Sequence, residues 1–334
     1  MSPRPRIAHV IGCPAGVGPE LSARILADAQ LHAQARIVAI GDARVLARGA
    51  RTAGVRLDLA TIGENDALPE GEGPVLIDVR RIDPDEVRVG ELAKPHGVAA
   101  MANFERAVAL ARAGAVDAVT FSPFNKASMR LAHPSYEDEV VFLNEALDFK
   151  GVAQEFNILP GLWNARVTSH VPIKGVAALI TRANVLRALR LTHAAMSASG
   201  FAPPRIAVAG LNPHAGDGGN FGREEIDEIE PAVAQAQAEG IVCAGPFPSD
   251  TVFVRAKKGD HDAVLTMYHD QGQIAMKLLG FEQGVTALGG YPFPVTTAAH
   301  GSAYDIAGKG VAHPGAMRNA MEIAIRMARA ARAA

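Results

Sequence analysis

The sequence predicts an α/β protein whose sheet is mainly parallel, and three observations support this. Short apolar runs alternate with alanine-rich helical patterns along the whole chain. Helical segments between successive strands are what a parallel sheet requires. No internal repeat, low-complexity tract or obvious linker interrupts the pattern. With 334 residues the chain is long enough for two lobes, and a lobe made from both chain ends fits as well as two consecutive lobes.

The individual elements follow from apolar patterning. Apolar residues recur every three or four positions in 97–114, which is typical of a helix with one buried stripe. The segment that ends the chain has the same pattern. The expected helices are 18–30, 92–114, 182–199, 222–239 and 315–333. The expected strands are 6–12, 35–41, 73–78, 115–123, 155–161, 165–170, 175–181, 205–213, 262–270 and 284–290.

Composition excludes several classes of protein. The net charge of −2 does not suit a nucleic-acid partner, because such proteins usually carry a basic stripe. Two cysteines, Cys13 and Cys243, make no disulfide framework and favour a reducing compartment. The first apolar run is short and lacks a cleavage site, and no window approaches 18 uncharged apolar residues. We therefore expect a soluble, cytoplasmic protein without a membrane partner.

The stretch 9–26 combines a strand, a glycine-rich turn and a helix start. Its glycines, Gly12, Gly16 and Gly18, do not have the G-x-G-x-x-G spacing, and no Walker lysine follows them. Pro19 suits the first turn of a helix. Backbone amides of such a turn can face an anion, but a plain strand-to-helix turn fits this stretch equally well.

Three histidines lie at the end of a predicted strand or just after one: His170, His214 and His269. Ligands gather at the carboxyl ends of strands in open α/β sheets. Three neutral imidazoles could hold a divalent transition metal, although the spacing is no metal signature and each could be a surface residue. The loop with His214 is rich in glycine, which favours close approach of backbone to a ligand.

Further polar candidates follow other strand ends. Asp250 comes after a proline-rich turn, and Lys277 lies eight residues beyond His269. A desolvated Lys277 near a metal could exchange protons, but a lysine among apolar residues is more often a surface residue. Asn125 and Lys126 could equally form a helix N-cap region.

Residues 300–314 are dominated by glycine and small side chains. This stretch resembles the adenosine-binding loop of isopropylmalate and isocitrate dehydrogenases, with Tyr304 in place of a proline and His313 in place of an asparagine. The whole chain more closely resembles the 4-hydroxythreonine-4-phosphate dehydrogenase (PdxA-like) family. The motifs that carry the resemblance appear in order as GCPAGVGPE, SPFNKAS, TSHVPI, LNPHAGDGGNFGREE, GPFPSDTVF, YHDQGQIAMK and HGSAYDIAG.

This resemblance implies two α/β/α lobes of isopropylmalate dehydrogenase-like type with the active cleft between them. One lobe would contain 1–130 and 290–334, and the other 131–289. Members of the resembled family form obligate homodimers, so we expect a homodimer here. Its metal site is shared across the interface, and the ligands match His170, His214 and His269. The expected metal is Zn, Mg, Mn, Co or Ni.

The resemblance also implies chemistry: oxidation of a β-hydroxy acid by NAD or NADP, with NAD favoured, followed by loss of carbon dioxide. Lys277 and Asp250 match positions at the substrate and would be catalytic. The expected cofactor-binding residues are Gly12, Gly16, Asn212, His300, Gly301, Ser302, Asp305 and His313.

Several positions that hold the substrate phosphate in the family are altered here. They are Glu137, Asp138, Thr286 and Val295, expected to line the substrate site. Since valine cannot replace a phosphate-binding arginine and carboxylates repel a dianion, we expect a non-phosphorylated substrate. The cis-dihydrodiol dehydrogenases of terephthalate breakdown fit best, with a cis-dihydrodiol carboxylate as substrate and a catechol-type product.

Two alternatives remain beside this reading. One is a dehydrogenase of 4-hydroxythreonine-4-phosphate or of a four-carbon sugar-acid phosphate. The other is a non-catalytic nucleotide- or metabolite-binding homologue. Cys13 is a further departure, because the related families usually carry aspartate there, and we expect it to be a structural replacement.

Overall fold

The computed structural model describes residues 4–201 and 203–333. The chain divides into two compact units, the first made of residues 1–151 and 291–334 and the second of residues 152–290. The first unit therefore contains both ends of the chain, and the chain passes between the units twice. Among the described residues, no helix is both long enough and apolar enough to cross a membrane.

The first unit extends beyond residue 130, where we expected the boundary, to residue 151. The reason is α6 (Glu139–Ala146), which packs on α4 (Lys94–Arg112) of the same unit. Phe142 of α6 stacks on Phe104 of α4 with ring centres 5.0 Å apart. The hydroxyl of Tyr291, just after the second crossing, donates to the carbonyl of Val140. These contacts join 131–151 to the first unit.

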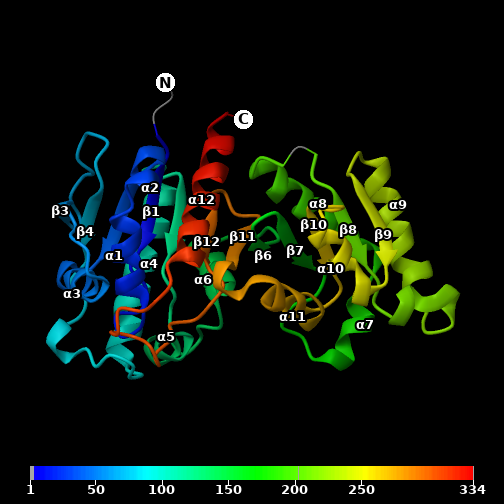
Figure 1. Ribbon diagram of the computed structural model, residues 1–334, viewed down its shortest axis with the longest axis horizontal. Helices are drawn as coiled ribbons and strands as arrows, with labels where there is room; N and C mark the ends of the chain where they lie inside the picture. Colours follow the sequence, from blue (N-terminus) through cyan, green and yellow to red (C-terminus); the bar gives the residue numbers. More distant parts are fainter. Residues whose placement is uncertain (1–3, 202, 334) are drawn as a thin grey trace. The chain divides into compact units, whose positions relative to one another are not determined.

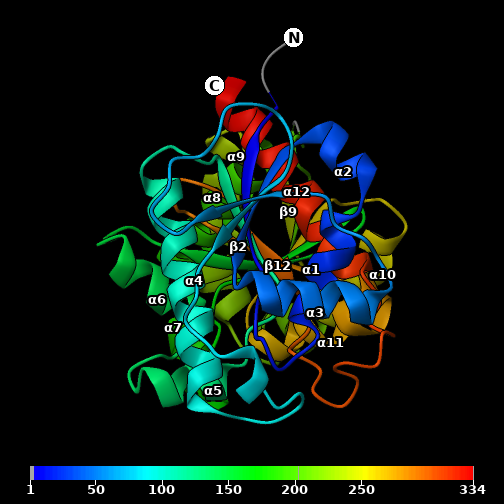
Figure 2. The same cartoon turned by 90° about the vertical axis from the view of Figure 1, so that its left-hand side faces the viewer.

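The sheet of the first unit is entirely parallel, as the alternation of strands and helices predicts. Helices α1, α3 and α12 pack together on one face, and α4 carries α5 and α6 on the other (Figures 1 and 2). In sheet order the strands are β3 (Ala60–Gly63), β4 (Val75–Asp78), β2 (Arg36–Gly41), β1 (Arg6–Val10), β5 (Ala118–Phe121) and β12 (Val295–Ala298). The remaining helices are α1 (Gly18–Leu26), α2 (Ala29–Gln34), α3 (Ala43–Ala53), α5 (Lys126–Ala132) and α12 (Gly315–Ala333).

The second unit has a mixed sheet in which β6 pairs antiparallel with both its neighbours. Helices α8 and α9 pack together, while α10 and α11 each pack against β10. In sheet order the strands are β11 (Val285–Gly289), β6 (Gln154–Leu159), β7 (Leu162–Arg166), β10 (Ala263–Thr266), β8 (Ile206–Ala209) and β9 (Cys243–Phe247). The helices are α7 (Val176–Leu179), α8 (Arg182–Ala198), α9 (Glu230–Ala238), α10 (Ser249–Lys257) and α11 (His269–Gly280).

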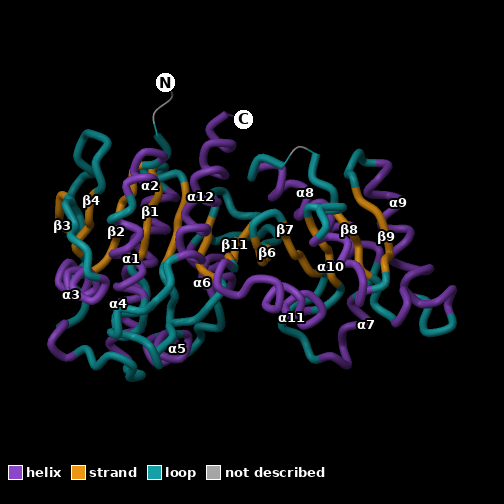
Figure 3. The backbone as a smooth tube through the Cα atoms, in the orientation of Figure 1, coloured by secondary structure: helices purple, strands orange, loops and turns teal. Residues whose placement is uncertain are grey.

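The strand expected at 175–181 is wrong. This segment forms α7, which follows β7 and precedes α8 in the chain and is drawn as helix in Figure 3. Val176 and Ile180 are buried while the residues between them are mostly exposed, so burial follows helical spacing and not alternation. The sequence pattern did not predict strands β3, β9 and β12. Strand β3 is largely exposed, so it has no buried apolar face that would indicate a strand.

Candidate active site

Two of the three candidate metal ligands lie side by side in the second unit. His170 follows the end of β7, and His269 is the first residue of α11. Their ring centres are 5.6 Å apart. Two imidazoles bound to one tetrahedral ion through nitrogens about 2.1 Å from it have ring centres roughly 5 Å apart. The pair therefore fits two positions of a divalent metal site.

Asp270 orients one of these rings. The Nδ1 atom of His269 lies 2.7 Å from the carboxylate of Asp270. A carboxylate on one ring nitrogen holds the proton there, and leaves the other nitrogen as a lone-pair donor. This is the arrangement that metal-ligating histidines commonly show.

His214 is not brought to this pair. It lies in the turn Pro213–Gly219, where its side chain is exposed. Within the described ranges, no group of three or more histidine, cysteine or acidic side chains is close enough to hold an ion. One chain, as described, thus supplies two adjacent imidazoles of the three expected.

A buried polar network lies next to His170, and sequence reasoning missed it. Arg166, the last residue of β7, donates to Glu155 at 2.7 Å and to Asn157 at 2.6 Å. Gln273 of α11 donates to the same Asn157 oxygen. Burial opposes ionisation of Glu155, but Arg166 and Asn157 outweigh it, so the pKa of this carboxyl lies below its usual value. The signal in the sequence was an arginine at the end of an otherwise uncharged strand.

The expected catalytic residues lie on exposed helix surfaces. Lys277 is on α11, about 12 Å along the helix axis from His269, since eight residues separate them. Asp250 is exposed in the first turn of α10. Among the described residues, neither Lys277 nor Asp250 forms a hydrogen bond or ion pair with the histidine pair.

The glycine turn of the first unit meets the C-terminal loop closely. The amide of Val17 donates to the carbonyl of Ser302 at 3.0 Å. A methyl group on Gly16 would lie 2.7 Å from that carbonyl oxygen, so only glycine fits. Gly12 has a φ of 77° and a methyl there would lie 2.6 Å from the Ser122 carbonyl oxygen. Both positions require glycine because another segment of the protein backbone approaches them closely.

The other expected cofactor residues divide between two settings. Ser302 is buried and accepts a hydrogen bond from Asn125, which also caps α5. Exposed positions are Gly301, Asp305 and His313, while His300 is half-buried. Asn212 lies in the second unit, where its side chain donates to Glu224 and Glu225.

Two of the four expected substrate residues, Asp138 and Val295, have structural roles in this chain. Asp138 is the N-cap of α6 and accepts from the amides of Val140 and Val141 at 2.9 Å. Val295 has no exposed surface and pairs with Val119 across the sheet. Glu137 is exposed and Thr286 is half-buried on β11.

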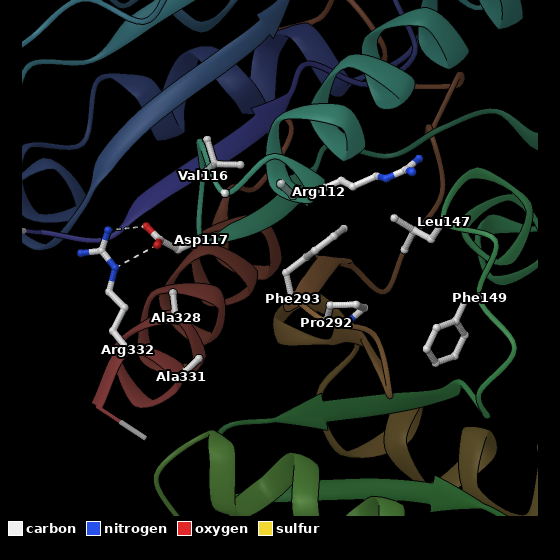
Figure 4. Close-up of a pocket in the computed structure, with 12 residues that line it drawn as sticks. Arg112, Val116, Asp117, Leu147, Phe149, Pro292, Phe293, Ala328, Ala331 and Arg332 are labelled. Atoms are coloured by element: carbon white, nitrogen blue, oxygen red, sulfur yellow. Dashed lines mark hydrogen bonds and ion pairs between the residues drawn. The ribbon is translucent and has the colours of Figure 1, made fainter.

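A separate cavity of about 400 Å³ lies in the first unit, near the end of α12 (Figure 4). Apolar side chains such as Phe293 and Leu147 line it, and Arg332 pairs with Asp117 at its edge. None of the expected site residues lines this cavity.

Comparison with known proteins decides the family. The family model described as "Pyridoxal phosphate biosynthetic protein PdxA" matches residues 33–324. The chain belongs to the PdxA family. A relative from Rhizobium meliloti (strain 1021), provisionally named 4-hydroxythreonine-4-phosphate dehydrogenase 2, is 54% identical over 99% of this chain and 95% of its own. A relative from Symbiobacterium thermophilum, provisionally named D-threonate 4-phosphate dehydrogenase, is 40% identical over 99% of both chains.

Solved structures agree with membership of the PdxA family. The 4-hydroxythreonine-4-phosphate dehydrogenase of Klebsiella pneumoniae is 35% identical, covers 98% of this chain and 99% of its own, and has a TM-score of 0.83. A terephthalate 1,2-cis-dihydrodiol dehydrogenase from Burkholderia xenovorans LB400 is 31% identical, and the match covers 94% of this chain and 95% of that one. Its TM-score is 0.66. The α/β architecture expected from the sequence is thereby confirmed.

These relatives overturn the expected substrate. A non-phosphorylated cis-dihydrodiol carboxylate is wrong, because the more similar PdxA relatives are named for phosphorylated substrates. The expectation treated Asp138 and Val295 as lining the substrate site. Asp138 caps a helix and Val295 is core, so their identities are explained without reference to a substrate.

Proposed function

We propose that this protein is a dehydrogenase that oxidises a secondary alcohol of a phosphorylated four-carbon hydroxy acid with NAD or NADP. 4-Hydroxythreonine-4-phosphate and D-threonate 4-phosphate are the two candidate substrates. The observation that carries the proposal is the match, over nearly the full length of both chains, to relatives named for these activities. The adjacent His170 and His269 support it, because they suit metal-assisted oxidation.

His170 and His269 would hold a divalent metal, with Asp270 orienting His269. Since His214 lies elsewhere in its own chain, we propose that His214 of a second copy completes the ligand set in a homodimer. When bound, the metal would polarise the substrate hydroxyl and the nicotinamide would accept the hydride. Nitrogen ligands favour Zn, Co, Ni or Mn over Mg.

The glycine turn and the loop 300–313 would hold the nucleotide. Their close approach at Gly16 and Ser302 leaves no room for a side chain between the two backbones. Small residues on both loops let a flat or phosphorylated ligand reach backbone amides. We retain Gly301, Asp305 and His313 as contacts because they are exposed on this loop.

The chain must also remove a proton. Oxidation takes a hydride from the carbon and a proton from the hydroxyl oxygen of the substrate, leaving a ketone. Lys277 and Asp250 are the proposed acceptors, directly or through water. Both are exposed and so available to a substrate or a second copy. Loss of carbon dioxide from a β-keto acid product remains a prediction.

A substrate panel tests the proposal. We would follow NADH and NADPH formation with both phosphorylated candidates, their unphosphorylated counterparts as matched controls, and a cis-dihydrodiol carboxylate, each with and without chelator. We expect turnover of one phosphorylated compound alone, and loss of turnover with chelator. Equal turnover of the unphosphorylated counterpart would refute a phosphate-specific site. Absence of turnover with nucleotide bound would favour a binding protein.

Product analysis separates the finer alternatives. Measuring carbon dioxide release beside NADH formation tests decarboxylation directly. One carbon dioxide per NADH is expected if the oxidised carbon lies β to the carboxylate. An intact keto acid in the absence of carbon dioxide would restrict the reaction to oxidation.

A further inference from the structure

The turn that carries His214 is left-handed. His214 and Ala215 have φ values of 53° and Asp217 has 45°, with Gly216 and Gly218 also positive. A residue with a side chain pays roughly 1–2 kcal/mol to adopt this conformation. Three such residues in one turn make a conformation that persists only where its surroundings hold it.

Glu225 is the residue that stabilises this turn. Its side chain is 1% exposed. One carboxylate oxygen accepts from the amides of Leu211 at 2.7 Å and Asn212 at 2.8 Å, and the other from the Asn212 side chain at 2.9 Å. The entry to the turn is therefore bound to one buried carboxylate.

The same carboxylate also meets the middle of the turn. A methyl group on Gly216 would lie 2.7 Å from Glu225 Oε2. Glycine is thus required there twice, by its φ of 81° and by the nearness of this oxygen. The amide of Phe221 closes the turn on the Gly216 carbonyl. Glu225 and Gly216 fit one another only while the turn stays left-handed.

Glu225 lies at the start of a helical segment. It begins a π-helical segment, Glu225–Ile229, that runs directly into α9. Single π turns inside helices are rare overall. Where they do occur, they often lie at functional sites. The start of the helix places the carboxylate, and the carboxylate holds the backbone that leads into the exposed His214.

We propose that Glu225 is a positioning residue that holds His214 in the left-handed turn, ready to ligate a divalent metal ion. This rests on the proposed function for the metal itself. Glu225 touches neither substrate nor metal in this scheme. It acts through the backbone of Leu211 and Asn212, so its removal frees the turn to relax toward right-handed or extended conformations.

The experiment measures Co²⁺ binding to the full-length protein by calorimetry and by visible absorption, which reports the number of ligands. Glu225→Gln places an amide NH₂ against the Asn212 side-chain donor, and we expect Co²⁺ affinity to fall about 10- to 100-fold. Faster hydrogen exchange over residues 211–221 should accompany it. Glu230→Gln, on an exposed position of α9, is the matched control and should leave both unchanged.

A second variant tests the strain. Ala215→Gly removes the cost of a left-handed side chain, so it should stabilise the turn and restore part of the Co²⁺ affinity when combined with Glu225→Gln. Should Glu225→Gln fail to fold, Gly216→Ala gives the same test, since its methyl would displace the carboxylate. Wild-type protein that binds no Co²⁺ would overturn the metal function as well as this role. Equal Co²⁺ affinity in wild type and the Glu225 or Gly216 variant would overturn the role alone.

Discussion

The thiol of Cys13 lies 3.3 Å from the hydroxyl of Tyr304, and this hydrogen bond joins the glycine turn to the C-terminal loop. From the resemblances in the sequence we expected aspartate in place of Cys13 and, by comparison with isopropylmalate and isocitrate dehydrogenases, proline in place of Tyr304. Burial raises the pKa of the Cys13 thiol, so at neutral pH it is protonated and unreactive. The pair also packs with Ala15 and Val87. We interpret the two departures as one structural replacement.

Tyr304→Phe tests this pair. Removing one hydroxyl breaks the hydrogen bond to Cys13 but keeps the ring packing. We expect faster hydrogen exchange in residues 300–310 and a two- to tenfold loss of nucleotide affinity, as suits one hydrogen bond of about 1 kcal/mol. Cys13→Ser, which replaces the thiol by a hydroxyl that can still donate and accept, is the companion variant, and its hydrogen exchange and nucleotide affinity should lie nearer to those of the wild type. Unchanged hydrogen exchange in Tyr304→Phe would show that the hydrogen bond between Cys13 and Tyr304 does not stabilise this loop.

His9 should make stability depend on pH. It is fully buried on β1, and its ring nitrogens lie 2.9 Å from the hydroxyls of Thr120 and Ser22. Burial lowers its pKa from 6.5 to about 3. Below pH 6.5 the unfolded chain therefore binds a proton that the folded chain refuses. Stability should fall between pH 6.5 and 3, by up to about 1.4 kcal/mol per pH unit from this group.

Urea unfolding at a series of pH values measures this effect. His9→Gln keeps a donor and an acceptor without a titrating ring, so its stability should fall less steeply over the same interval. If the free energy of unfolding fell equally steeply with decreasing pH in wild type and His9→Gln, His9 would not be the cause of the pH dependence.

Asp270→Asn should weaken metal binding. The carboxylate holds Nδ1 of His269 and so strengthens the other nitrogen as a ligand. An amide of the same size lacks the charge, and we expect a 10- to 100-fold loss of Co²⁺ or Zn²⁺ affinity by competition with a chelator. Glu282→Gln, on an exposed residue of the same unit, controls for charge. A loss of equal size in both variants would point to net charge and not to orientation.

Arg166→Met should destabilise the second unit. The arginine side chain is 2% exposed and donates to Glu155, Asn157 and Ser169. Its removal leaves the Glu155 carboxylate without its cation, at a cost of about 3 kcal/mol. The double variant Arg166→Met with Glu155→Gln should recover much of this in denaturant unfolding. A double variant as unstable as the single one would show that packing, and not charge, is lost.

Much of the fold was visible in the sequence. Strands such as β2 and β8 are mainly apolar runs, because both faces of a parallel sheet are covered by helices. The local sequence pattern did not predict the secondary structure correctly where tertiary packing determines it. Residues 175–181 contain an apolar run that serves equally for a strand or a short helix, and only the burial of Val176 and Ile180 at helical spacing resolves it.

The sequence by itself determined the family, the alternation of many strands and helices, and the residue types at each strand end. Only the tertiary structure decided that His170 meets His269 while His214 does not, that Asp138 is a helix cap, and that Glu225 holds a left-handed turn. The physical reason is that these contacts depend on how neighbouring elements are placed. The pairing of β7 with β10 brings the loops after them together, and no local pattern encodes that distance.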